Sequence, residues 1–543
     1  MSRKNKNQCP AKVEVRRTGI LVHDYIRGDY PKLERYFQTW NKGRYCYDDI
    51  AMYIDNDTDT LYLPAGIQFW IIQKFFKHNI WRKHKSDPYL MVKQIKLKTR
   101  PRDKVQEEAI DFCVGGEKYP QNRGAAQFFL NLNTGKGKTY VMVATSAYFS
   151  VKTAIIMSSL DWIQQWKSCI LEYTNTQPEQ IYVIAGTASI IKILKGITDV
   201  RKVKYYLISH DTIRAYGDKY GWEEVHELFK RLYIGIKVYD EAHLYFTNIF
   251  KIDFFTDVWR TYYLTATPML SDPFKNQVFQ RAYATVPKIN LFDDEVDPHT
   301  DYQAVIYNSH PSAVDLTDCS SVYGFNLMWY ATYLVMKPIY YKILWIVMDW
   351  VLETISDKGK ILIYIGTNQA IQMTYWWLRY MYPRHSIGIF TTLTKKENKR
   401  RQLDKKIILS TAKSAGAALD IRDLEVTIDI DDPAKSPVVV RQKLGRTRDL
   451  HTTFFDIVDV GFPQLRYYYE SKQPIFAKYA KRILPPIILN DVEIRERLMA
   501  IRQRDEQYLK DFQEKNKQYL LPVMEFRKQV MVFEDPEKNK IQY

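Results

Sequence analysis

A short segment rich in glycine and lysine has the composition of a phosphate-binding loop. It runs Asn133-Thr134-Gly135-Lys136-Gly137-Lys138-Thr139 and follows an apolar run. Glycines let backbone N–H groups turn inward around a phosphate, and the Lys138 ammonium can reach the β- and γ-phosphates of a nucleotide. The Thr139 hydroxyl can ligate Mg²⁺. Leu132 stands where the full G-x-x-x-x-G-K-[ST] spacing has a glycine. The segment predicts a nucleotide site, and a surface turn is the alternative.

Two adjacent acids follow about a hundred residues later, at the end of another apolar run. They belong to the segment Val238-Tyr239-Asp240-Glu241-Ala242-His243. At such a position Asp240 can hold nucleotide-bound Mg²⁺, and Glu241 can orient or deprotonate the attacking water. Paired acids at a strand end also occur in solvated turns. The phosphate loop earlier in the chain favours the catalytic interpretation.

Two later segments add candidates for the same chemistry. The first is Leu264-Thr265-Ala266-Thr267-Pro268, again after an apolar run. The second is Gln442-Lys443-Leu444-Gly445-Arg446-Thr447-Arg448. A guanidinium from a second domain can stabilise charge on a γ-phosphate, as an arginine finger does. On its own the second segment is equally typical of a basic loop.

Short apolar runs must supply the strands that position these groups. They recur at Ala126–Leu130, Ala154–Met157, Ile181–Ile184, Tyr205–Ile208, Ile234–Tyr239 and Thr261–Leu264, and again at Ile361–Ile365, Ser386–Phe390, Lys406–Ser410, Val426–Ile430 and Thr453–Val458. Helix-like segments separate the runs, which is typical of βαβ units and parallel sheets. We therefore expect an α/β fold with two parallel sheets. An aromatic-rich region precedes them, and a charged helical pattern follows.

Composition limits the class of protein and its partner. Lys and Arg exceed Asp and Glu by 79 to 62, a net charge of +17 that favours a polyanion such as nucleic acid. A hydrophobic content of 46% excludes a wholly disordered chain. The five cysteines form no CxxC pair, which argues against a disulfide framework or a zinc site. The apolar region 325–355 is interrupted by charges and a proline, so we expect a buried or amphipathic helix pair there. No apolar signal core is seen, and we expect a protein that is not secreted: cytoplasmic, nuclear, or of a virion or viral factory.

The order of the motifs resembles that of superfamily-two helicases with the literal DEAH spelling. The resemblance covers roughly residues 100–460 and is closest to the XPB/UvsW branch, which contains phage and large-virus DNA helicases. The branch is indicated by Leu61-Tyr62-Leu63-Pro64-Ala65-Gly66 and by Arg100-Pro101-Arg102-Asp103-Lys104-Val105-Gln106. The first resembles a segment that these enzymes carry before the motor, with Ala65 in place of Arg. The second resembles the segment whose glutamine contacts adenine.

The resemblance implies two RecA-like domains in tandem, a small N-terminal α+β module and a helical C-terminal tail. The implied boundaries are 1–99 for a nucleic-acid-binding module, 100–285 for the ATP-binding domain, 286–335 for a linker, 336–480 for the second motor domain and 481–543 for the tail. ATP and Mg²⁺ are the implied cofactors. DNA, single-stranded or branched, is the implied partner, with RNA as a possibility and no membrane.

The resemblance also assigns roles to individual residues. Catalysis falls to Lys138, Asp240, Glu241, Gln442 and Arg446, and nucleotide binding to Gln106, Thr134, Gly135, Lys136, Gly137, Lys138 and Thr139. Thr139 and Asp240 would hold the metal. Coupling to nucleic acid falls to Thr265, Thr267, Ser158, His210, Gly366 and Thr411. The final motif departs from the family's GRxxR because Arg448 comes one place early, so it is either a shifted finger or a structural arginine.

The function that these expectations describe is ATP-driven movement on DNA with unwinding or remodelling, in replication, recombination or repair. An RNA helicase or transcript-release factor with the same motor stays open. So does a duplex translocase that does not unwind, and so does a binding subunit with an inactive motor. Two basic segments, Arg82–Lys104 with a net charge of +7 and Lys395–Lys406 with +5, are candidate phosphate contacts. Solvated surface charge is the alternative for both segments.

Overall fold

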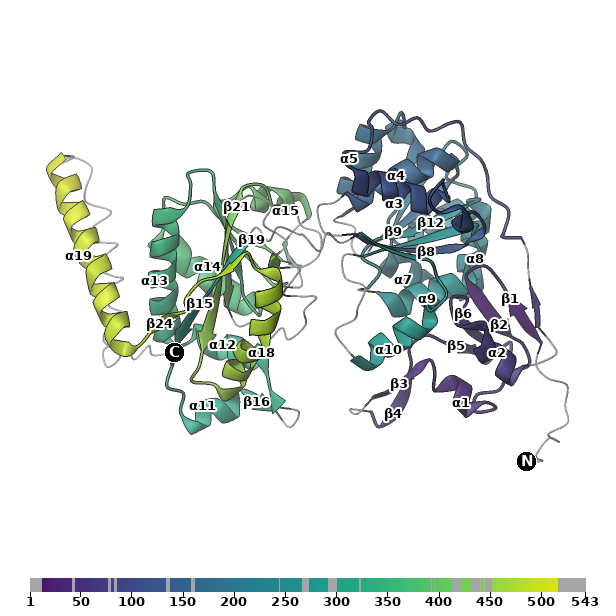
Figure 1. The fold of residues 1–543 in the computed structure, drawn as a ribbon. Coiled ribbons are helices and arrows are strands. Elements are labelled where there is room, and N and C mark those ends of the chain that lie inside the picture. The colour runs from purple at the N-terminus through teal and green to yellow at the C-terminus, as the bar shows by residue number, and fades with distance from the viewer. Residues whose placement is uncertain are drawn as a thin grey trace. The chain divides into compact units, whose positions relative to one another are not determined.

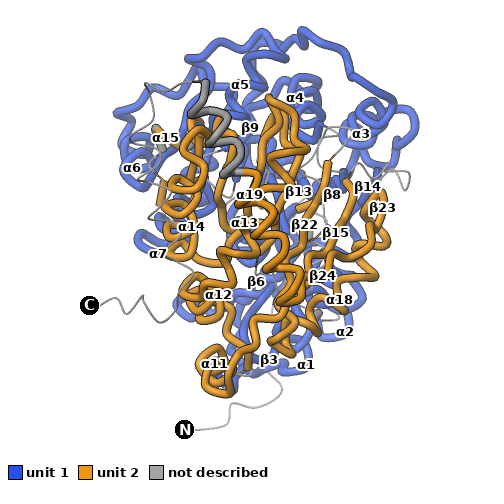
Figure 2. Tube along the Cα trace, turned by 90° about the vertical axis from the view of Figure 1, so that its left-hand side faces the viewer, with its two compact units in different colours: residues 1–296 blue, residues 297–543 orange. Residues whose placement is uncertain are grey.

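The computed structural model divides into two compact units, Met1–Val296 and Asp297–Tyr543 (Figure 2). The structure describes residues 12–41, 44–76, 80–82, 85–132, 137–157, 162–243, 245–265, 273–291, 300–321, 324–391, 393–394, 396–412, 421–430, 440, 443–444 and 452–515.

The first unit begins with a small α+β module. Its five-stranded sheet has the order β5-β6-β2-β1-β7, and the strands β3 and β4 form a separate antiparallel hairpin. The elements are β1 (Val13–Val15), β2 (Gly19–Val22), α1 (Pro31–Glu34), β3 (Gln38–Asn41), β4 (Cys46–Asp49), β5 (Tyr53–Asp55), β6 (Thr60–Pro64), α2 (Phe69–Phe75) and β7 (Ile80–Arg82). All pairings of the larger sheet are antiparallel except that of β1 with β7.

A seven-stranded parallel sheet forms the centre of the first unit, in the order β10-β11-β9-β12-β13-β8-β14. Its strands are β8 (Gln127–Leu132), β9 (Thr153–Met157), β10 (Ile181–Ile184), β11 (Tyr205–Ser209), β12 (Ile236–Tyr239), β13 (Arg260–Thr265) and β14 (Lys288–Leu291). Its helices are α3 (Lys104–Val114), α4 (Lys138–Phe149), α5 (Ile163–Tyr173), α6 (Thr187–Leu194), α7 (His210–Tyr220), α8 (Trp222–Arg231), α9 (Phe246–Phe255) and α10 (Pro273–Ala282). Figure 1 shows α3, α4 and α5 on one face and α7 and α9 on the other.

Burial on both faces explains why the central strands β9 and β11 are almost continuously apolar. Successive residues of β8 point to opposite sides: Phe128 and Leu130 join the core beneath α3–α5, whereas Phe129 joins the core on the other face. That second core extends into the N-terminal module, where the ring of Tyr62 lies 4.7 Å from that of Phe255. The module therefore shares a core with the first α/β domain.

A glycine of the module makes one of these contacts possible. Gly66, the last residue of the segment predicted from its Leu-Pro pattern, accepts a 2.8 Å backbone hydrogen bond from Thr285. A side-chain carbon at Gly66 would lie 2.7 Å from the carbonyl oxygen of Ala282. The close approach of two backbones thus requires glycine at this position.

The second unit holds another sheet whose neighbouring strands are all parallel, in the order β19-β20-β18-β21-β22-β15-β23, with β24 also paired to β15. Its strands are β15 (Thr300–Tyr307), β18 (Lys360–Tyr364), β19 (Ile387–Phe390), β20 (Ile407–Ser410), β21 (Leu424–Ile430), β22 (Thr452–Asp459), β23 (Arg482–Ile483) and β24 (Ile487–Leu489), besides the hairpin β16 (Ser320–Ser321) and β17 (Gly324–Phe325). Its helices are α11 (Ala313–Asp318), α12 (Leu327–Val335), α13 (Pro338–Thr354), α14 (Asn368–Met381), α15 (Lys396–Leu403), α18 (Pro463–Tyr479) and α19 (Asp491–Lys515).

The predicted fold class is confirmed: two α/β domains with parallel sheets, a small N-terminal α+β module and a C-terminal helix. The region 325–355 forms the expected helix pair, α12 and α13, with a buried face. None of the helices in the described part of the chain is long and apolar enough to cross a membrane. Residues 286–335, the expected linker, include β14, β15 and α11. The tail helix α19 packs on α13, where Arg504 pairs with Asp349 and Glu353.

Candidate nucleotide site

The phosphate-loop residues that the structure describes lie at the carboxyl end of β8. Gly137 has a left-handed backbone with φ of 82° and caps α4, which begins at Lys138. Thr139 follows in the first turn of that helix, whereas Thr134, Gly135 and Lys136 lie outside the described residues. Ligands of parallel α/β sheets bind beyond the carboxyl ends of the strands, where helix N-termini favour anions. Leu132, in the place of the usual glycine, is the buried last residue of β8.

Gln106 is fixed against this loop. Asp103 caps α3 by accepting a 2.9 Å hydrogen bond from the backbone N–H of Gln106, and Gln106 Oε1 accepts another of 2.9 Å from Arg102 N. The amide nitrogen of Gln106 then lies so near Gly137 that a side-chain carbon on the glycine would overlap it. The structure therefore brings the predicted adenine contact next to the predicted phosphate loop.

The two acids follow β12, close to Lys138. The Lys138 Nζ lies 3.3 Å from Glu241 Oε1, and both side chains are largely buried. Asp240 accepts a 2.9 Å hydrogen bond at Oδ2 from the indole Nε1 of Trp166, a fully buried residue of α5. Burial first, and the charge of Glu241 second, raise the pKa of Asp240 to about 6, while Lys138 and Trp166 oppose the shift. Elements far apart in sequence thus converge on one acidic centre.

His243 connects this centre to the end of β13. Its Nδ1 lies 3.4 Å from Glu241 Oε2 and 2.9 Å from the Thr265 hydroxyl. Burial lowers the pKa of His243, with Glu241 acting in the opposite direction. Thr265 is fully buried, and Thr267 lies outside the described residues. A movement of Glu241 can therefore be transmitted to the segment that begins at Thr265.

His210, expected to couple to nucleic acid, lies in the interior of the first unit. Its ring is stacked between those of Tyr239, at 5.6 Å, and Tyr245, at 5.1 Å. It is 0% exposed, and burial lowers its pKa to about 3. In this arrangement His210 offers no surface to a ligand and acts, at most, through its two tyrosine neighbours. Ser158 lies outside the described residues.

The described candidates of the second unit lie at neighbouring strand ends. Gly366 follows β18 and Thr411 follows β20, and these two strands pair directly. Gly366 is exposed, and Thr411 is partly buried. Gln442, Arg446 and Arg448 lie outside the described residues.

Two residues of these sites were not predicted. Trp166 is the first, and its hydrogen bond to Asp240 has no sequence signature. Lys443 lies within the arginine motif, and its Nζ forms a buried ion pair with both carboxylate oxygens of Asp429, at 2.9 and 2.8 Å. The only hint in the sequence was Asp429, an acid between Ile428 and Ile430 near the end of β21, which needs a cation when it is buried.

The donors present fit a magnesium nucleotide. Hard oxygen ligands suit Mg²⁺, and Asp240 and the Thr139 hydroxyl supply them. Lys138 supplies the positive charge that a triphosphate requires, and Gly137 lets the backbone pass close to the Gln106 amide. Bound Mg²⁺ would neutralise phosphate charge.

Comparisons with known proteins bear on the first α/β domain. Residues 96–270 match the family model described as the res subunit of type III restriction enzymes, ResIII. The match covers about a third of the chain. No curated protein matches the chain in sequence.

Three solved structures are among those similar to this chain, each with a TM-score below 0.5. Dbp5 of S. cerevisiae bound to RNA and ADP BeF3 has 14% identity, a TM-score of 0.47, and coverage of 73% of this chain and 93% of its own. T4 UvsW has 12% identity, a TM-score of 0.33, and coverage of 89% and 100%. The Hef helicase domain of Pyrococcus furiosus has 12% identity, a TM-score of 0.39, and coverage of 68% and 97%.

Proposed function

We propose that this protein is an ATP-dependent helicase or translocase of superfamily two that moves on DNA and unwinds or remodels it. The observation that carries the proposal is the convergence of Lys138 with Glu241, 3.3 Å apart, at the carboxyl end of a parallel sheet. The ResIII match over residues 96–270 supports it independently. The net charge of +17 favours a nucleic acid as the partner.

Each group at the site has a task in this proposal. Lys138 and the backbone around Gly137 hold the phosphates, and Gln106 selects the base. Glu241 orients the attacking water and accepts its proton, which general-base catalysis requires within hydrogen-bond reach. His243 contacts both Glu241 and Thr265, so the state of the acid is passed towards the nucleic-acid side of the domain. Branched intermediates of replication, recombination or repair are the proposed substrates, as in the XPB/UvsW branch.

ATP hydrolysis by the full chain tests the proposal, with and without single-stranded, forked and duplex DNA and with RNA. We expect Glu241→Gln to lower turnover by about 10²–10⁴-fold, the range for loss of a positioned acid–base group. Lys138→Ala should abolish turnover, because it removes the cation that holds the phosphates. Lys230→Ala and Glu227→Gln are matched controls, because that exposed pair on α8 is also 3.3 Å apart. Wild-type turnover in either site variant would refute the assignment of the nucleotide site. Stimulation of hydrolysis by RNA alone would identify RNA, and not DNA, as the substrate.

A further inference from the structure

A basic strap connects the N-terminal module to the first α/β domain. It comprises residues 85–104, all of which the structure describes, and contains almost no regular secondary structure. Figure 1 shows it as a dark blue trace along the outside of the first unit, leading to α3. Seven of its residues are exposed cations: Lys85, Lys93, Lys96, Lys98, Arg100, Arg102 and Lys104.

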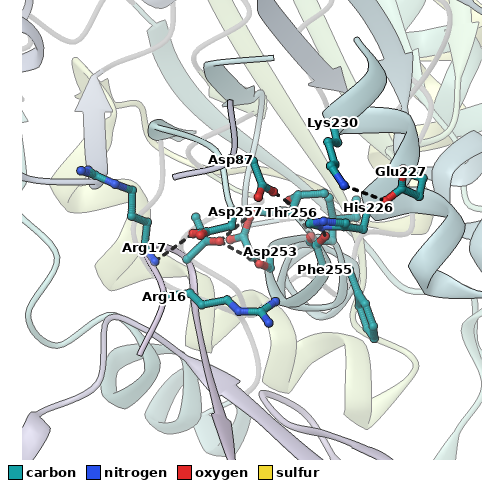
Figure 3. Close-up of polar contacts among 12 residues, drawn as sticks. Arg16, Arg17, Asp87, His226, Glu227, Lys230, Asp253, Phe255, Thr256 and Asp257 are labelled. Atoms are coloured by element: carbon teal, nitrogen blue, oxygen red, sulfur yellow. Dashed lines mark hydrogen bonds and ion pairs between the residues drawn. The ribbon is translucent and has the colours of Figure 1, made fainter. Parts of the chain in front are cut away.

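Backbone hydrogen bonds fix the course of the strap. Asp87 N donates to Asp257 O at 2.9 Å at its start, beside His226 (Figure 3). Val92 N donates to Ser150 O at 2.8 Å, and Lys98 N to Tyr173 O at 2.8 Å. These bonds use main-chain atoms, and the side chains of Lys85, Lys93, Lys96 and Arg100 are exposed. Lys98 Nζ donates to Leu171 O at 2.8 Å, and Arg102 pairs with Asp103. The strap is thus a fixed row of cations.

The carboxylates within the strap are already engaged. Asp87 lies 3.6 Å from the ring of His226, and Asp103 caps α3 and pairs with Arg102 at 3.2 Å. The charge of Lys93 acts on a further cation, Lys204, which directly precedes β11. Burial first, and the charge of Lys93 second, lower the pKa of Lys204. Adjacent cations that repel one another are stabilised by a polyanion.

The strap has the chemistry of a duplex contact rather than a single-strand contact. Proteins that hold single strands combine cations with aromatic side chains on which unpaired bases stack. Tyr89 is the one aromatic residue of the strap, and its ring is stacked on Trp259 at 5.3 Å. A row of cations with no exposed aromatic ring suits the backbone of a duplex, in which the phosphates face outward and the bases are paired inside the helix.

We propose that the strap formed by residues 85–104 binds the phosphate backbone of duplex DNA, as a contact separate from the motif residues at the carboxyl ends of the strands. The inference rests on the proposed function, since it names a second surface for the same partner. It gives the enzyme a hold on paired DNA that does not depend on the nucleotide site.

The test is binding of the full chain to a labelled 30-base-pair DNA duplex, a DNA single strand and an RNA duplex over a salt series. The variant is Lys85→Ala/Lys93→Ala/Lys96→Ala, which lies outside the segment Arg100–Gln106. The control is Lys192→Ala/Lys195→Ala/Lys219→Ala, which removes the same charge from α6, its C-cap and α7. Each phosphate contact contributes about 0.9 to the slope of log affinity against log salt for duplex DNA. We expect the strap variant to reduce that slope by about 2 to 3 and the control to leave it unchanged.

Three results would overturn the proposal: an unchanged duplex slope, an equal loss in the control, or a loss confined to the single strand or the RNA duplex. ATP hydrolysis without nucleic acid, measured on the same samples, separates this proposal from the proposed function. The strap variant should keep wild-type basal turnover. If wild-type protein hydrolyses ATP in response to DNA and the strap variant binds duplex normally, the strap is excluded and the motor stands. Absence of hydrolysis in the wild type refutes the motor.

Discussion

The indole Nε1 of Trp166 donates a 2.9 Å hydrogen bond to Oδ2 of Asp240. Trp166 lies on α5, which follows β9, whereas Asp240 follows β12. Trp166 is 1% exposed, so its orientation is set by packing and the bond persists without competition from water. The tryptophan therefore fixes the carboxylate that is proposed to hold Mg²⁺, from the helix whose leading segment is expected to contact nucleic acid.

We predict that Trp166→Phe changes the metal dependence of ATP hydrolysis. Phenylalanine keeps an aromatic ring in the core but removes the N–H donor, and a hydrogen bond to a charged group contributes about 1.5–3 kcal/mol. The Mg²⁺ concentration for half-maximal hydrolysis should rise roughly tenfold to a hundredfold, which corresponds to that energy. Trp162→Phe, on the same side of β9, is the control and should leave the Mg²⁺ requirement unchanged. A normal Mg²⁺ curve in Trp166→Phe would show that the hydrogen bond has only a structural role.

We predict that Gly137→Ala impairs both folding and hydrolysis. A non-glycine residue at φ of 82° costs about 1–2 kcal/mol, and the added carbon overlaps the Gln106 amide. The urea concentration at the midpoint of unfolding of the first unit should fall, and so should ATP turnover. The double variant Gln106→Ala/Gly137→Ala removes the overlap but not the backbone strain, so stability should recover only in part. Full additivity of the two single variants would contradict a contact between these side chains.

His210 predicts a specific dependence of stability on pH. Its pKa is about 3 in the folded protein and near 6.5 when unfolded, so the unfolded state binds the proton first. This contribution is complete above pH 6.5 and is lost as the pH falls from 6.5 towards 3, with a loss of about 2 kcal/mol at pH 5. His210→Phe keeps an aromatic ring between Tyr239 and Tyr245. Between pH 7.5 and 5 its free energy of unfolding should fall by about 2 kcal/mol less than that of the wild type. Urea midpoints at both pH values measure the difference, and parallel shifts in the two proteins would disprove it.

The sequence predicts strands better than it predicts the surroundings of individual side chains. Continuous apolar runs such as Ile181–Ile184 mark strands because a parallel strand is buried on both faces, and that pattern is local. His210 shows the limit of such reasoning. Its place in a motif suggested a groove, but the stack with Tyr239 and Tyr245 depends on tertiary packing of β12 against α7. The strand β15, with its alternating burial, was missed for a related reason, because its partners β22, β23 and β24 all lie far along the chain.

The Lys443–Asp429 pair gives a prediction for the second unit. Both side chains are 2% exposed in an ion pair of 2.8 Å, so Lys443→Met leaves a buried and uncompensated carboxylate. Breaking a buried pair in this way costs about 3–5 kcal/mol, whereas replacing both partners by apolar residues is often neutral. Hydrogen exchange of the amides in β21 should therefore become roughly 10²–10³-fold faster in Lys443→Met, by that energy.

The double variant Lys443→Met/Asp429→Leu should restore most of the protection in β21. Arg466→Met is the control, because its 3.2 Å pair with Glu470 is exposed and such pairs contribute about 0–1 kcal/mol. Lys443 also follows Gln442 directly and precedes Arg446 by three residues, so ATP turnover in Lys443→Met reports on whether the pair holds the arginine motif in place. If turnover stays normal while the β21 amides lose their protection from exchange, the Lys443–Asp429 pair contributes only to stability. Loss of turnover that the double variant does not rescue would assign Lys443 a positioning role beyond burial of charge.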